Sequence, residues 1–152
     1  MLATLSLATV MVGVTVVFHF LGLIRLTTLM EVHGSRLRPH ESQAGSALLL
    51  LMIVFGVFAL HTAEIWAYAA LYRILGETSS FEEALYYSTC TFAAIGYGDV
   101  VLSVKWRMLG AIEGANGVIL FAWSTAFLLG VTAHLKVFNH PWLAHTASDD
   151  KA

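Results

Sequence analysis

Three long apolar stretches restrict the fold of this chain more than any other feature. They run from Met1 to Ile24, from about Ala44 to Leu71 and from about Trp106 to Leu135. Each is long enough to cross a hydrocarbon core of about 30 Å as a helix. With 58% hydrophobic and only 12% charged residues, so short a chain cannot bury this much apolar surface within itself. The sequence therefore predicts an all-α, multi-pass membrane protein.

The first stretch contains no charged residue. It is too long for the apolar core of a signal peptide, and it lacks the basic start that a signal peptide has. We expect residues 1–30 to form a retained transmembrane helix and the start of a polar linker, Arg25–Ser42. The absence of arginines at three-residue spacing excludes a voltage sensor in this helix.

The segment between the second and third stretches predicts a short helix followed by extended chain. Ser79-Ser80-Phe81-Glu82-Glu83 is typical of a capped helix start, because a serine and a glutamate three residues later satisfy free amide groups. A helix from Phe81 to about Phe92 is about 18 Å long, about half a bilayer. Residues 94–99, if extended, return about 20 Å. We therefore expect a re-entrant loop, which membranes tolerate only where it is buried in protein or lines a watery pathway.

In this loop Gly96 and Gly98 alternate with Ile95 and Tyr97. Glycine reaches backbone angles that other residues avoid, so alternating conformations can turn successive carbonyl oxygens to one side. Such carbonyls from four chains can replace the hydration shell of a potassium ion. We expect the side chains of Ile95 and Tyr97 to pack against the short helix, whose negative C-terminal end favours a cation. The alternative is an ordinary extracellular turn with a chance Gly-Tyr-Gly.

Residues 84–99, ALYYSTCTFAAIGYGD, resemble the pore helix and selectivity filter of the potassium channel family. The resemblance covers residues 44–135 and implies a pore domain of outer helix, pore helix, filter and inner helix, with the first helix packed outside the pore. It further implies a homotetramer with no catalytic chemistry and no cofactor besides the permeant K⁺. The implied filter residues, followed by Asp99 at the outer mouth, are Ala94, Ile95, Gly96, Tyr97 and Gly98.

Two positions depart from the family pattern. Ala94 stands where the family usually has threonine, so the innermost ion site would keep only carbonyl oxygens. Cys90 stands where some members have a glutamate that pairs with the filter aspartate. We therefore expect Asp99 to find another partner, such as water.

In the third stretch Gly110, Gly114 and Gly117 fall on one helical face. Small residues at this spacing let membrane helices approach closely, and we expect this packing role for Gly110 and Gly114. The resemblance places a gating hinge near Gly117. Three residues that follow are candidates to line the cavity: Phe121, Ser124 and Thr125.

The family resemblance also implies an orientation. The third helix runs inward, so residues 136–152 form a short cytoplasmic tail, Arg25–Ser42 is cytoplasmic and Met1 lies outside. The positive-inside rule agrees weakly, with inside residues Arg25, Arg36, Arg38, Lys136 and Lys151 against outside residues Arg73, Lys105 and Arg107. We expect the plasma membrane, and from the minimal architecture a bacterial inner membrane.

Ionisable residues inside the apolar stretches are functional hypotheses by default. His61 and Glu64 share one face of the second helix, and we expect them near its outer end, bonded to the short helix or to Arg107. A pH-sensing role and half of a metal site are the alternatives, although a third ligand is not evident. Glu113 is expected to pair with Arg107 or His61, and His19 to be a satisfied buried histidine.

The sequence thus predicts a potassium-selective channel. Its partners would be further copies of the chain, the lipid bilayer and K⁺ ions, and the absence of a basic run argues against nucleic acid. Because of Ala94, a weakly selective cation channel is the first alternative. A metal-dependent membrane enzyme using His61, Glu64 and Glu113, or a non-conducting accessory subunit, are less favoured.

Overall fold

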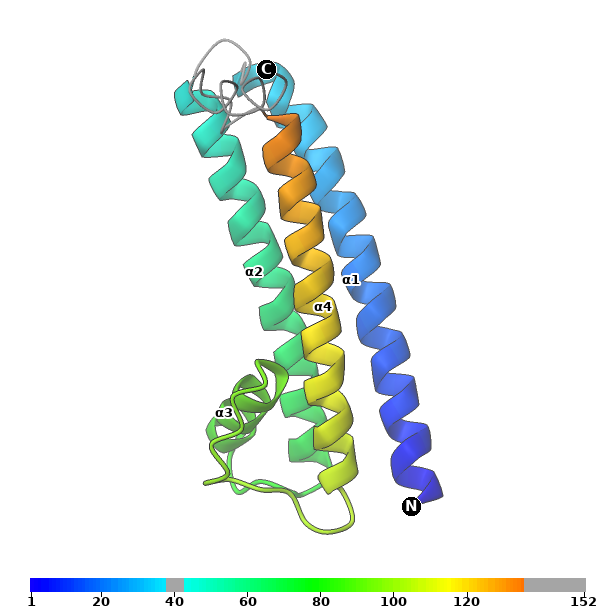
Figure 1. Cartoon of the computed structure of the whole chain (residues 1–152). Coiled ribbons are helices and arrows are strands. Elements are labelled where there is room, and N and C mark those ends of the chain that lie inside the picture. The colour runs from blue at the N-terminus through cyan, green and yellow to red at the C-terminus, as the bar shows by residue number, and fades with distance from the viewer. Residues whose placement is uncertain (38–42, 136–152) are drawn as a thin grey trace, which may run out of the picture.

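The computed structural model describes residues 1–37 and 43–135. Three long helices run side by side, and one short helix lies with its connecting loops beside one end of their bundle (Figure 1). The helices are α1 (Leu2–Leu37), α2 (Gln43–Ile74), α3 (Phe81–Phe92) and α4 (Arg107–His134). The short helix α3 packs against α2 and α4, while α1 packs on the other side of these two. The structure therefore has a core of α2, α3 and α4 with α1 added to it.

Three of these helices are long and apolar enough to cross a membrane, over Leu2–His33, Ala44–Ile74 and Arg107–His134. This confirms the three predicted spans. The polar loop expected at Arg25–Ser42 is wrong in its first part, because α1 continues to Leu37. No proline interrupts the chain before Pro39, and a long arginine side chain can extend from an apolar helix toward the membrane surface. Residues 38–42 and the predicted tail 136–152 lie outside the described residues.

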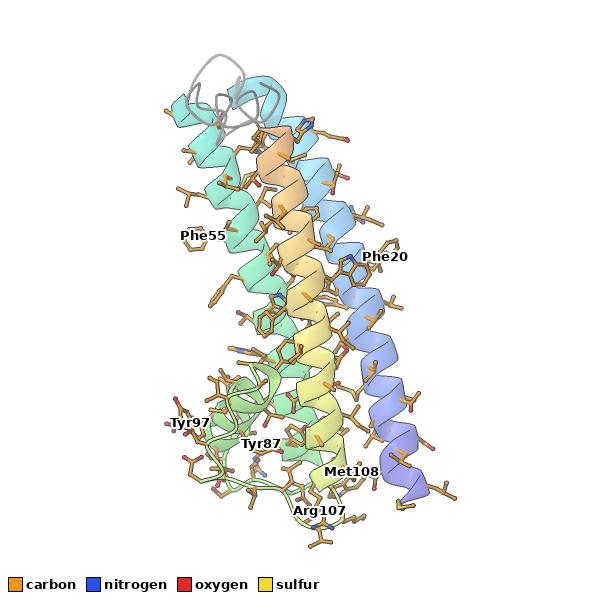
Figure 2. The ribbon with its side chains drawn as sticks, viewed as in Figure 1. Phe20, Phe55, Tyr87, Tyr97, Arg107 and Met108 are labelled. Atoms are coloured by element: carbon orange, nitrogen blue, oxygen red, sulfur yellow. The ribbon has the colours of Figure 1, made fainter. Side chains whose placement is uncertain are left out.

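Glycines allow α1 and α2 to approach closely. A Cβ atom added at Gly22 of α1 would collide with the side chain of Leu60, and one added at Gly56 of α2 would collide with Leu26. Close approach of this kind is the main source of helix association in lipid, where burial of apolar groups offers little. Aromatic side chains such as Phe20 and Phe55 instead project outward from α1 and α2 (Figure 2).

The start of α3 follows from its sequence. The side chain of Ser80 caps the helix by accepting a hydrogen bond from the amide of Glu83 at 3.1 Å. The Glu83 carboxylate in turn accepts from the amide and the hydroxyl of Ser79, both at 2.6 Å. These hydrogen bonds lower the pKa of Glu83. The predicted cap and the predicted bounds Phe81–Phe92 are confirmed.

Candidate functional site

The loop that follows α3 has an alternating backbone. Ala94, Gly96 and Gly98 have φ angles of +55°, +58° and +79°. Neither Ile95 nor Tyr97, which lie between them, has a positive φ angle. Glycine adopts positive φ freely, whereas for alanine the left-handed conformation costs about 1–2 kcal/mol. The alternation of backbone conformation predicted from the Gly-Tyr-Gly sequence is therefore present. It begins at Ala94, two residues before the first glycine.

Backbone amides of this loop are turned toward α3. The N–H groups of Ile95 and Gly96 both donate to the carbonyl oxygen of Cys90, at 2.8 and 3.2 Å, and Ala94 donates to Thr91 at 2.9 Å. These bonds satisfy carbonyl groups that the end of a helix would otherwise leave unpaired. The opposite side of the loop is open, and residues 93–99 are all exposed.

The side chains of Ile95 and Tyr97 do not pack against α3 as expected. Ile95 is 52% exposed and Tyr97 is 70% exposed, and Tyr97 projects outward from the loop (Figure 2). A pocket of about 180 Å³ lies between the loop and α3, lined by residues 86, 87, 90, 91 and 96–101.

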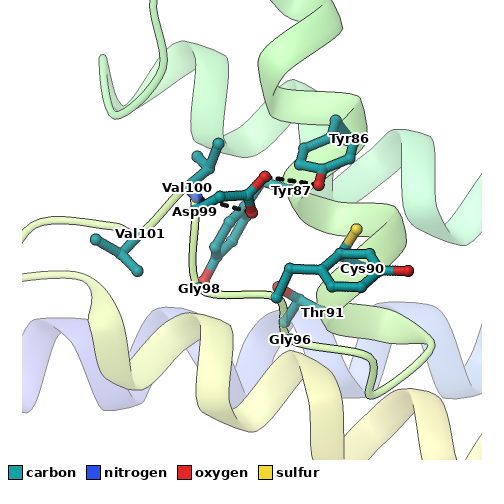
Figure 3. Close-up of a pocket in the computed structure, with 10 residues that line it drawn as sticks. Tyr86, Tyr87, Cys90, Thr91, Gly96, Gly98, Asp99, Val100 and Val101 are labelled. Carbon is teal, nitrogen blue, oxygen red and sulfur yellow. Dashed lines mark hydrogen bonds between the residues drawn. The ribbon is translucent and has the colours of Figure 1, made fainter.

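Asp99 has a partner on α3. The hydroxyl of Tyr86 donates to one carboxylate oxygen at 2.7 Å, and the amide of Val100 donates to the other at 3.1 Å (Figure 3). The hydrogen bond from Tyr86 lowers the pKa of Asp99 and raises that of Tyr86 to about 12. Water was the partner suggested from the sequence, and Tyr86 was not identified. The available signal was its phenol, which lies one helical turn before Cys90 on α3.

Side-chain hydrogen bonds connect the loops at the end of the bundle where α3 lies. The carboxylate of Glu77 accepts hydrogen bonds from the amide and the hydroxyl of Ser103, at 2.7 and 2.9 Å. On the other side, the hydroxyl of Thr4 in α1 donates to the carbonyl of Lys105 at 3.1 Å. The segments before and after the alternating loop are thus fixed to each other and to α1.

The glycine face of α4 lies against α3. A Cβ atom added at Gly110 would collide with the hydroxyl of Tyr87, and one added at Gly114 would come within 3.2 Å of the carbonyl oxygen of Thr91. The packing role expected for these two glycines is confirmed. At Gly117 an added Cβ would collide with the backbone of Phe92, so this residue also has a packing role. The gating hinge near Gly117 stays a prediction.

The three cavity-lining candidates have different surroundings. Phe121 and Thr125 are exposed on the surface of the single chain. Ser124 is only 4% exposed, and its hydroxyl lies 2.9 Å from the Nε2 atom of His61. Ser124 thus points into the bundle of the single chain, because successive residues on a helix point in different directions, and the cavity-lining role of the three residues stays a prediction.

Glu113 is fully buried where α2, α3 and α4 meet. Its two carboxyl oxygens lie 2.5 Å from the hydroxyl of Tyr72 and 2.5 Å from the hydroxyl of Ser88. The expected pairing with Arg107 or His61 is wrong. The position along α4 indicated a buried face, but it could not indicate which neighbouring helix that face meets.

A second buried cluster joins α1, α2 and α4. Glu64 contacts the Nδ1 atoms of His19 at 2.9 Å and of His61 at 3.0 Å. The expected partners of His61 and Glu64, the short helix or Arg107, are wrong, because these residues bond to His19, Ser124 and each other. The expectation of a buried, satisfied His19 is confirmed. His19 also supplies the third side chain of a possible metal-binding group with His61 and Glu64, which the sequence did not reveal. Among the described residues, Glu113 does not join this cluster, so the predicted convergence of His61, Glu64 and Glu113 is not observed.

Comparison with known proteins agrees with this architecture. Residues 47–133, more than half of the chain, match the family described as "Ion channel". No curated protein and no solved structure matches the chain. The matched range contains most of α2, the whole of α3, the alternating loop and nearly all of α4, whereas α1 lies outside it. This chain therefore belongs to the ion channel family, with a two-helix domain of the potassium channel type and an additional apolar helix at its N-terminus.

Proposed function

We propose that four copies of this chain form a potassium-selective channel in which residues 94–98 are the selectivity filter. The observation that carries the proposal is the alternation of positive φ angles at Ala94, Gly96 and Gly98. With the amides of Ile95 and Gly96 bonded to α3, the carbonyl oxygens are free to face the opposite side. Rings of such carbonyls from four chains replace the water around K⁺.

The exposure of the loop side chains supports assembly of several copies. Ile95 and Tyr97 present large apolar surfaces on a loop beside an open pocket. A neighbouring copy of the chain can cover these exposed side chains. Homo-oligomers usually have closed symmetry, in which every copy covers the same surface of its neighbour. We therefore place the neighbouring chain against Tyr97, and the filter at the axis of the tetramer.

The outer mouth would concentrate cations. Asp99 stays ionised down to low pH because Tyr86 lowers its pKa. Three more carboxylates lie in the connecting segment or at the start of α3: Glu77, Glu82 and Glu83. Rings of negative charge attract cations to a pore entrance. The resemblance to the potassium channel family assigns residues 136–152 to the cytoplasm in this proposal, and the minimal architecture favours a bacterial inner membrane.

Cation flux from purified protein in liposomes tests the selectivity. We expect a reversal potential that follows the gradient of K⁺ and is nearly independent of Na⁺. The second candidate, a weakly selective cation channel, rests on Ala94, which offers no hydroxyl to the innermost site. A reversal potential that follows both ions equally would favour this candidate over the first.

A pair of glycine substitutions tests the filter itself. Gly96→Val should abolish flux, because a β-branched residue is strained at a φ of +58°. The matched control is Gly13→Val in α1, where an added Cβ meets nothing within 4 Å. Unchanged flux in Gly96→Val would contradict a filter at residues 94–98, and no flux from the purified wild type would favour an accessory subunit. Native mass spectrometry should give four copies, and a stable monomer or dimer would contradict the assembly.

A further inference from the structure

Four buried polar side chains form a closed ring between α1, α2 and α4. They are His19, His61, Glu64 and Ser124, which are 0%, 6%, 1% and 4% exposed. Aromatic rings surround this histidine–glutamate ring, with Trp123 against His19 and with Phe121 and Phe92 against His61. Ionisable groups inside a membrane bundle are costly and are retained for a role. The channel proposal above assigns none to them.

The contacts divide the ring into two sides. On one side, Glu64 offers one carboxylate oxygen to the Nδ1 atom of His19 at 2.9 Å and the other oxygen to the Nδ1 atom of His61 at 3.0 Å. On the other side, the Ser124 hydroxyl oxygen lies 2.9 Å from the Nε2 atom of His61 and 3.2 Å from that of His19. Each of these four contacts needs one hydrogen.

The hydrogens present do not suffice. An ionised carboxylate only accepts, a neutral imidazole carries one N–H, and a serine carries one O–H. With Glu64 ionised and both imidazoles neutral, two imidazoles and one serine bring three hydrogens to four contacts. An unpaired polar atom is unfavourable in an apolar interior. Either one added proton or a metal ion bound between Glu64 and the two Nδ1 atoms would remove this mismatch.

We propose that a transition-metal dication of the Zn²⁺ type binds between the Nδ1 atoms of His19 and His61 and the carboxylate of Glu64. One ligand atom from each residue lies within 4.8 Å of the other two. A tetrahedral zinc site, with bonds of about 2.0–2.2 Å, places its ligand atoms about 3.4 Å apart, so the two Nδ1–carboxylate contacts of 2.9 and 3.0 Å would lengthen slightly around the ion. Because each carboxylate oxygen faces its own imidazole, Glu64 can bind with both and complete four donor atoms.

Ser124 fits this site as a supporting group. A metal ion on Nδ1 leaves each imidazole with its hydrogen on Nε2. The hydroxyl oxygen of Ser124 has two lone pairs and accepts both of these N–H groups. All the contacts are then satisfied, and the shortage of hydrogens disappears. Imidazole and carboxylate together suit Zn²⁺, whereas Mg²⁺ and Ca²⁺ prefer oxygen ligands alone. The bound ion would tie α1 to the two long helices of the channel domain.

Metal retention by the purified full-length chain in detergent tests the proposal, with Zn²⁺ and Co²⁺ as probes. The variant is Glu64→Gln, because the introduced amide supplies the missing hydrogen and keeps the ring closed but binds metal poorly. The control is His33→Gln, which removes a histidine of α1 whose ring contacts only the carbonyl of Leu29, at 3.0 Å. After dialysis, we expect the wild type and the control to retain about one metal ion more per chain than Glu64→Gln.

Two further readouts need no variant. Co²⁺-loaded wild type should show the visible absorption of a tetrahedral site, and Zn²⁺ should raise the unfolding temperature where Mg²⁺ does not. Equal metal content in all three proteins, with no stabilisation by Zn²⁺, would overturn the proposal and leave a ring that holds only protons. These measurements involve no ion flux, so their outcome tests the metal site independently of the channel function.

Discussion

The chain buries two glutamates inside its helical bundle, and their surroundings differ. Glu64 and Glu113 are 1% and 0% exposed. Glu64 meets two imidazoles, from His19 and His61, which can carry positive charge. Glu113 meets only the hydroxyls of Tyr72 and Ser88. The same residue type therefore serves a site that calls for a cation in one place and a neutral network in the other.

Hydrogen counting at Ser88 supports the neutral assignment. Its hydroxyl oxygen lies 2.5 Å from Glu113 and 3.0 Å from the carbonyl of Ile65, yet it has a single hydrogen. An ionised Glu113 would compete with this carbonyl for that hydrogen. If Glu113 is protonated, its carboxyl can donate to Ser88, while Ser88 donates to Ile65 and Tyr72 donates to the second carboxyl oxygen. This network joins α3 to α2 and α4, whereas the histidine–glutamate ring joins α1 to α2 and α4.

The largest expected difference between the two sites is in the loss of unfolding free energy when each glutamate is replaced with leucine. With a chelator present, Glu64→Leu leaves two buried imidazoles without their acceptor and should cost about 2–6 kcal/mol of unfolding free energy, at about 1–3 kcal/mol for each unpaired group. Glu113→Leu leaves the Tyr72 hydroxyl unpaired while Ser88 keeps Ile65, and should cost about 1–3 kcal/mol. Reversible unfolding in mixed micelles measures both. Equal losses would show that the two surroundings are energetically alike.

Removing one donor from the neutral network should have a smaller effect. Tyr72→Phe deletes the hydroxyl that contacts Glu113 and should cost about 1 kcal/mol. The comparison is Tyr68→Phe in the same helix, because the Tyr68 hydroxyl interacts with Thr15 and contacts Asn116 at 3.4 Å rather than a carboxyl group. We expect Tyr68→Phe to stay within about 0.5 kcal/mol of the wild type. A loss in Tyr72→Phe as large as in Glu64→Leu would indicate a charged Glu113.

The isosteric change Glu113→Gln is a more direct probe of protonation. The introduced amide can donate to Ser88 and accept from Tyr72, as the neutral carboxyl does. We therefore expect a change below about 1 kcal/mol in the same unfolding measurement. A loss of several kcal/mol, with Ser88→Ala as a reference for damage to the network, would show that a carboxylate is required there.

The sequence predicted the local features of this fold well. Apolar length was sufficient for the three spans, and Ser80 and Glu83 determined the start of α3 because a helix cap depends only on neighbouring residues. The alternation of glycines predicted the backbone of the loop for the same reason. These features need no knowledge of how one helix packs against another.

The partners of buried polar residues could not be predicted in this way. His19 lies 45 residues before Glu64, on a helix that the resemblance did not cover, so no spacing rule connected the two. Glu113 was assigned to the wrong partners because periodicity identifies a face but not the helix opposite it. The available signal was that each polar group in an apolar span must find a partner, which would have directed attention to His19 together with His61 and Glu64.

Asp99 is a third carboxylate that has a protein partner, but it is exposed. The smallest expected effect is therefore a shift of its titration midpoint. Tyr86 lowers its pKa below the ordinary value of 3.8, so the stabilising hydrogen bond is complete above that pH and is lost as the pH falls through the lower value in the folded protein. In Tyr86→Phe the titration midpoint of Asp99, followed by NMR of the carboxyl carbon, should therefore move to higher pH. Tyr87→Phe, at the next position of α3, should leave the midpoint unchanged. If both variants titrate like the wild type, solvent rather than Tyr86 determines the charge of Asp99, and only the buried carboxylates depend on their protein partners.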